Sequence, residues 1–163
     1  MTEESHVMVL RALIQEVKEH RNDYIKIYAG ERRYNYILNG FYPPKNGSCI
    51  TPPDKWLTLP DMGHIIASCY NRSVVQMITL DIRVSETFFP LRGRPPVNSK
   101  SNMICLGLIP NHFVLLSLKD GCSLPPSSTE WKLHKSEEAT KWEEQERPVS
   151  QKKTNKSRQS YYV

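Results

Sequence analysis

The stretch Met103–Leu118, M-I-C-L-G-L-I-P-N-H-F-V-L-L-S-L, decides the fold of this 163-residue chain. It consists of two apolar arms, 103–109 and 113–118, joined by Pro110-Asn111-His112. Two apolar runs separated by a few turn residues are typical of an antiparallel β-hairpin. Because both arms are almost continuously apolar, we expect the hairpin to lie in the centre of a sheet.

Helical patterns precede this hairpin. Residues 4–28 repeat apolar side chains at steps of three and four, which predicts an amphipathic helix. A second, shorter helix is predicted over 31–38. Within 56–70 a further helix is predicted to start at Pro60–Asp61, with Asp61 capping its first turn and Asn71 ending it. Other predicted elements are strands over 74–80 and 87–91 and a helix over 129–145. The order predicts an α+β domain, with N-terminal helices followed by a small, mostly antiparallel sheet.

The charge of the chain is unevenly distributed. Its net charge is +5, but residues 147–163 hold five of the 22 Lys and Arg residues and none of the 17 Asp and Glu residues. Residues 1–146 therefore carry 17 charges of each sign. We expect a balanced domain over 1–146 and a basic, disordered tail over 147–163.

Cysteine spacing and hydropathy bear on location. Cys49, Cys69, Cys105 and Cys122 show no C-x-x-C pattern and no zinc spacing. The apolar stretch 103–118 is too short and too polar at its middle to span a bilayer. We expect reduced thiols, no membrane contact, no cofactor, no metal, and a cytoplasmic or nuclear location.

His112 is the candidate catalytic residue. It stands at the hairpin turn, where a histidine can act as a general base because its ordinary pKa is close to neutral. The alternative is a turn histidine with no catalytic role. The remaining histidines have simpler interpretations: His20 and His64, on predicted helices near Arg21 and Asp61, are expected to be surface or capping residues, and His6 and His134 are given no catalytic role.

A general base needs a nucleophile, and none of the four cysteines fits. Cys105 lies inside an apolar arm that places it away from His112, and Cys69 falls on the apolar face of its helix. Cys49 and Cys122 lie in loops without a feature that would lower a thiol pKa. The residues alone give a candidate base without a partner.

Five segments together resemble a known family. They are V-M-V-L-R-A-L-I-Q-E-V-K-E-H-R-N-D-Y (Val7–Tyr24), K-W-L-T-L-P-D-M-G-H-I-I-A-S-C-Y-N (Lys55–Asn71), E-T-F-F-P-L-R (Glu86–Arg92), I-C-L-G-L-I-P-N-H-F-V (Ile104–Val114) and D-G-C-S-L-P-P-S-S-T-E-W (Asp120–Trp131). The chain resembles, over about residues 5–135, the ovarian-tumour (OTU) cysteine-protease domain, in its divergent plant, fungal and transposon-associated branch.

The resemblance implies a papain-like fold and isopeptidase chemistry on ubiquitin or a ubiquitin-like modifier. The family's catalytic histidine is followed by an aromatic residue, a pattern that His112-Phe113 matches. Its nucleophile lies in an Asp-Gly-x-Cys motif at a helix N-terminus, which does not occur before residue 7. The Asp120-Gly121-Cys122 triplet follows the histidine and is no substitute. Val114 stands where many members carry an Asp or Asn that orients the imidazole, and Asn111 is the neighbour that could take this role.

These departures predict an N-terminally truncated, OTU-like domain that lacks the nucleophile helix and has no peptidase activity. One alternative is an active deubiquitinase whose first exon is missing from the sequence. Another is a transposon-derived, nucleic-acid-associated protein that uses the basic tail, although the balanced domain argues against it. The expected partner is ubiquitin or a ubiquitin-like protein. Self-association is also expected, because apolar faces would lack the missing helix.

Overall fold

The computed structural model describes residues 3–42, 58–78, 84–109, 112–119 and 121–146. Its described part is an α+β fold, as predicted. The helices are α1 (Glu3–Glu19), α2 (Arg21–Ile27), α3 (Glu31–Gly40), α4 (Leu59–Tyr70), α5 (Thr129–His134) and α6 (Thr140–Glu146), with a short 3₁₀ turn over Ser99–Asn102. The strands are β1 (Val74–Ile78), β2 (Glu86–Phe88), β3 (Ile104–Ile109) and β4 (His112–Leu116).

The four strands form one mixed sheet in the order β2-β1-β3-β4. β1 pairs antiparallel with β2 and β3 pairs antiparallel with β4, but β1 and β3 run parallel. The hairpin is therefore present, with Ile109 opposite His112. Its predicted central position is wrong for one arm, since β3 lies inside the sheet and β4 lies at its edge. Leu115 on β4 is 78% exposed, so a continuous apolar run does not by itself indicate burial on both sides.

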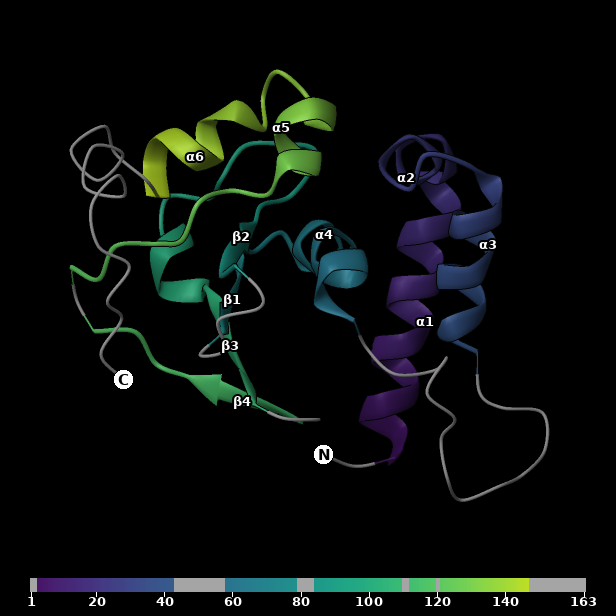
Figure 1. Cartoon of the computed structure of the whole chain (residues 1–163), viewed down its shortest axis with the longest axis horizontal. Coiled ribbons are helices and arrows are strands. Elements are labelled where there is room, and N and C mark those ends of the chain that lie inside the picture. Colours follow the sequence, from purple (N-terminus) through teal and green to yellow (C-terminus); the bar gives the residue numbers. More distant parts are fainter. Residues whose placement is uncertain (1–2, 43–57, 79–83, 110–111, 120, 147–163) are drawn as a thin grey trace.

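Helix α4 lies between the sheet and α1, α3 lies beyond α1, and α2 lies at the upper end of α1 and contacts α5 (Figure 1). α5 and α6 lie on the β2 side of the sheet, away from β4 (Figure 1). The largest core joins α1–α4 to Trp131 and Trp142 of the C-terminal helices. A second core fills the space between α4 and the sheet around Phe88, and a third covers the opposite face of the sheet around Cys105 and Leu124.

Two predicted helices are divided in the structure. Residues 4–28 form α1 and α2, because His20 leaves helical geometry at φ −111° and ψ 34°. Residues 129–145 form α5 and α6, because Lys135 is extended at φ −63° and ψ 147°. The amide of Ser136 then donates to the carbonyl of Leu91 (2.8 Å), a contact that no helical pattern reveals.

The start of α4 also differs from the prediction. The N-cap residue is Thr58, not Asp61, and its side chain makes no capping bond to the backbone. Asp61 accepts a hydrogen bond from the Thr58 hydroxyl (3.0 Å) and pairs with Arg33. The predicted end at Asn71 is confirmed, since this residue adopts the left-handed conformation at φ 49° and ψ 50°. Cys49 and the basic tail at 147–163 lie outside the described residues.

Candidate functional site

His112, the predicted catalytic base, is the first residue of β4 and its side chain is exposed. The next residue, Phe113, is half-buried and packs toward Leu59 and Ile66 of α4 and the sheet residues around them. Phe113 therefore packs inside the fold, and the imidazole of His112 lies exposed at the end of the hairpin. The surface position suits a group that meets a large partner.

Val114 occupies the position two residues after the histidine, opposite Gly107 on β3. A Cβ atom on Gly107 would come within 3.1 Å of Val114 Cγ2 and 3.0 Å of Leu116 Cδ1. Gly107 therefore makes room for the apolar side chains of β4. Val114 has no acceptor for an imidazole N–H, and Asn111, the predicted alternative, lies outside the described residues.

Two of the described cysteines, Cys105 and Cys69, lie in surroundings that do not favour a nucleophilic thiolate. Cys105 is buried in β3 opposite Leu116, four residues along β4 from His112, or about 13 Å at roughly 3.3 Å per residue. Burial, reinforced by the nearby Cys122, raises the pKa of Cys105 to about 11. Burial and then the charge of Glu16 raise the pKa of Cys69 on α4. A protonated thiol is a poor nucleophile, so the prediction that Cys69 and Cys105 are inert agrees with their surroundings.

His64 contradicts its predicted surface or capping role. It lies on α4, is 1% exposed, and its ring meets that of Phe88 edge to face at 5.1 Å. Nε2 lies 2.7 Å from Ser128 Oγ and Nδ1 lies 3.4 Å from the carbonyl oxygen of Phe89. Burial, partly offset by this carbonyl, lowers the pKa of His64 to about 4. Asp61 lies one turn before His64, which favoured a capping role for His64. In the structure this face of α4 is buried, because it packs against Phe88.

The neighbouring hydrogen bonds show which atom donates in the His64–Ser128 contact. Ser128 Oγ caps α5 by accepting from the amide of Trp131 (3.1 Å), so its own hydrogen is free to be donated to His64 Nε2. Neutral His64 then carries its proton on Nδ1, directed at the Phe89 carbonyl. A serine donating to a histidine resembles the pair of a serine hydrolase, but Ser128 is 0% exposed. A buried hydroxyl cannot reach a substrate, so the contact fastens α5 to α4.

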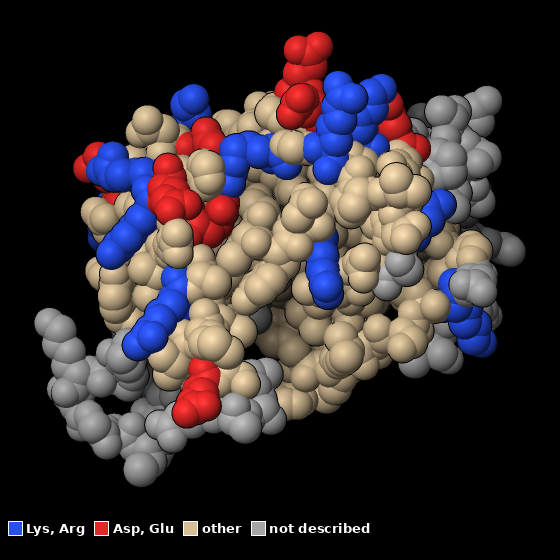
Figure 2. Space-filling model, turned by 180° about the vertical axis from the view of Figure 1, so that it is seen from behind, with Lys and Arg blue, Asp and Glu red and all other residues tan. Residues whose placement is uncertain are grey.

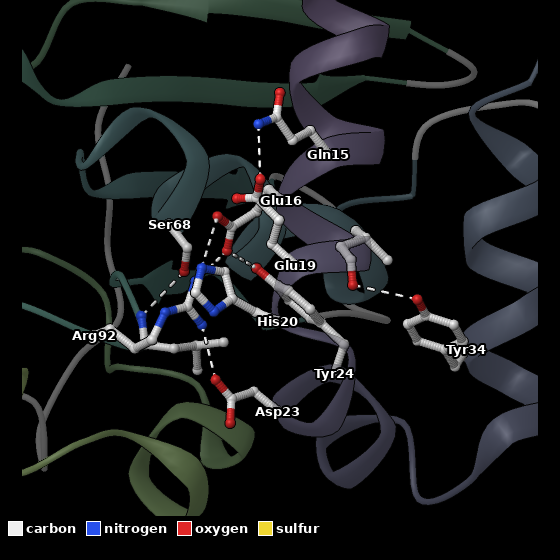
Figure 3. A network of polar contacts seen from close by, with 11 residues as sticks. Gln15, Glu16, Glu19, His20, Asp23, Tyr24, Tyr34, Ser68 and Arg92 are labelled. Atoms are coloured by element: carbon white, nitrogen blue, oxygen red, sulfur yellow. Dashed lines mark hydrogen bonds and ion pairs between the residues drawn. The ribbon is translucent and has the colours of Figure 1, made fainter.

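Arg92 is the centre of a second polar network (Figure 3). It pairs with Glu16 of α1 and with Asp23 of α2, the latter at 3.0 Å. Tyr24 donates its hydroxyl to Glu16 (2.7 Å), and its pKa is raised, first by burial and then by this carboxylate. The network ties the E-T-F-F-P-L-R segment to α1 and α2. One cation thus faces two carboxylates from different helices, and these pairs hold the three segments together, which is a structural role.

Glu146, at the end of α6, is a buried carboxylate outside both networks. It is 2% exposed, and neither of its oxygens has a hydrogen-bond partner among the described residues. Burial raises its pKa, and the nearby hydroxyls of Ser73 and Ser99 lower it by less. Burial therefore favours the protonated form of this side chain.

On the face shown in Figure 2, Lys and Arg side chains lie next to Asp and Glu side chains along the upper and left parts, whereas the middle is mostly uncharged and is hollowed below its centre. No group of three or more His, Cys, Asp or Glu side chains that could hold a metal ion occurs within the described ranges. None of the described helices is long and apolar enough to cross a membrane.

No family model, curated protein or solved structure matches the chain. The fold class is thus given by the structure itself. The OTU resemblance stays a prediction that rests on the sequence segments and on the position of His112.

Proposed function

We propose that the chain is an OTU-like domain that binds ubiquitin or a ubiquitin-like protein without cleaving it. The observation that carries this proposal is the separation of His112 from Cys105. His112 is exposed at the end of the β3–β4 hairpin, whereas Cys105 is buried on β3 opposite Leu116, four residues along β4 from His112. Thiol catalysis needs an imidazole within hydrogen-bond reach of the sulfur.

The surroundings of His112 also support binding. Phe113 anchors the strand that carries His112, so little backbone freedom would be lost when the imidazole contacts a partner. Leu115 on the same strand is 78% exposed, and an exposed apolar side chain beside a polar one is compatible with a protein partner, since protein interfaces combine an apolar centre with a polar rim. The sequence offers no Asp-Gly-x-Cys within its 163 residues that could restore the covalent route.

The proposal is tested by titrating the 163-residue protein into isotope-labelled ubiquitin and following the ubiquitin resonances. We expect shifts that include the C-terminal tail of ubiquitin, and no covalent adduct with a ubiquitin probe carrying a C-terminal electrophile. His112→Ala should weaken the affinity at least threefold, while His134→Ala on α5 should leave it unchanged. Absence of shifts at millimolar ubiquitin would refute binding, and an adduct on any cysteine would refute the lack of catalysis.

A further inference from the structure

The outer edge of β4 is the least protected part of the sheet. β4 is the last strand in the order β2-β1-β3-β4, and no described strand pairs with its outer side. An edge strand presents alternate N–H and C=O groups that can pair with another extended chain. An extended chain could therefore pair with this edge.

The sequence of the edge has none of the usual protection. Between Ile104 and Leu118 there is no Lys, Arg, Asp or Glu. β4 pairs with β3 over five consecutive residues, Ile109↔His112 to Cys105↔Leu116, without a bulge. Natural sheets discourage pairing at their edges with charges, prolines or bulges, and the described residues of β4 contain none of these.

Leu115 shows which face of the strand is incomplete. Phe113, two residues earlier and therefore on the same face, packs into the core beneath α4, whereas Leu116 on the opposite face packs around Cys105 and Leu124. Leu115 continues the α4 face outward but stays 78% exposed. An apolar side chain from a neighbouring strand would complete this face.

We propose that β4 pairs antiparallel with β4 of a second copy of this chain, about a two-fold axis at Val114. Pairing all five residues of the strand with those of its copy puts the axis at the middle residue. This register sets Leu115 of one copy opposite Phe113 of the other, on the same face of a continuous eight-stranded sheet. The contact is isologous and closes at two copies.

The charge of the edge favours this occupant over a charged peptide. A segment rich in Lys or Glu would lose hydration against an uncharged strand without gaining an ion pair. A second β4 is uncharged and supplies the apolar partner that Leu115 lacks. Residues 1–146 carry equal numbers of acidic and basic residues, so the part of the chain that contains β4 adds no net charge of its own to the contact, and the net charge of +5 comes from residues 147–163.

Sedimentation velocity of the full 163-residue chain, without ubiquitin, tests the pairing. We expect a species of twice 18.9 kDa that dissociates on dilution. Leu115→Lys should raise the dissociation constant at least tenfold, because the lysine would face Phe113 of the other copy. Leu133→Lys is the matched control, since Leu133 is 72% exposed but lies on α5, and it should leave the mass unchanged.

A second variant gives a positive signal. Val114→Cys at the two-fold axis brings two sulfurs into range, because opposed residues of antiparallel strands have Cα atoms about 4.5–5.5 Å apart. It should form a disulfide-linked dimer on oxidation, well above the level of Leu133→Cys. A monomer at every concentration, a dimer that resists Leu115→Lys, or equal cross-linking of the two cysteine variants would overturn the proposal. A monomer whose ubiquitin binding is lost in Leu115→Lys would assign the edge to the modifier instead.

Discussion

Two histidines, His64 in the core and His112 on the edge strand, differ in how the fold holds them. His64 is buried between α4 and α5, hydrogen-bonded on both nitrogens, and its pKa is lowered to about 4. His112 is exposed on an edge strand, and its neighbour Phe113 provides the anchor. The comparison shows that a serine–histidine contact can be wholly structural, while the exposed histidine without a nucleophile is the one that a partner can reach.

The largest expected effect on stability is at Trp131, where α5 packs against Phe89 and Pro90. Trp131 on α5 is fully buried, its indole N–H donates to the Pro90 carbonyl (2.9 Å), and its ring meets Phe89 at 5.0 Å. Trp131→Ala should lower the free energy of unfolding by about 3–5 kcal/mol, because it leaves a cavity and an unpaired carbonyl. Urea denaturation measures this value.

Leu133→Ala, two residues along α5, is the control for that change. Its side chain is 72% exposed, so the free energy of unfolding should change by less than about 0.5 kcal/mol. Equal losses in the two variants would show that α5 does not pack as the structure describes.

The pH dependence of stability tests the neutral state of His64. Its pKa falls from an ordinary 6.5 to about 4 on folding. Above pH 6.5 the residue is neutral in both states and has no effect. As the pH drops from 6.5 to 4, the unfolded chain binds a proton that the folded chain refuses. The free energy of unfolding should then fall by about 1.4 kcal/mol per unit, or about 3 kcal/mol in total.

This measurement needs a variant for comparison, because Glu146 has the opposite sign. Its raised pKa makes the folded state take up a proton more readily, so its contribution to stability increases as the pH falls. His64→Gln removes the contribution of His64 to the pH dependence of the free energy of unfolding and leaves that of Glu146 in place. A wild-type profile no steeper than that of His64→Gln between pH 6.5 and 4 would contradict a buried, neutral His64.

Local patterns in the sequence predicted the α+β class, the hairpin, α3 and the stop at Asn71. They failed where distant residues decide the conformation. The break at Lys135 depends on Ser136 bonding to Leu91, and the burial of His64 depends on Phe88 and Ser128. The edge position of β4 was also not predicted, because the apolar composition of 113–118 favoured a hairpin in the centre of the sheet. The separation of His112 from Cys105 was predictable, because a hairpin register fixes which residues face each other.

The smallest expected effect on stability is at His112 on the edge strand, and this variant is the most informative about the role of His112. His112→Ala should change the free energy of unfolding by less than about 0.5 kcal/mol, because the exposed imidazole adds little to the packing of β4. The same variant is expected to weaken ubiquitin binding, so affinity and stability are measured on one preparation, by titration and by urea denaturation. Loss of both together would mean that His112 acts through the fold of β4. Loss of affinity at unchanged stability would separate a binding histidine at the edge from the structural histidine in the core.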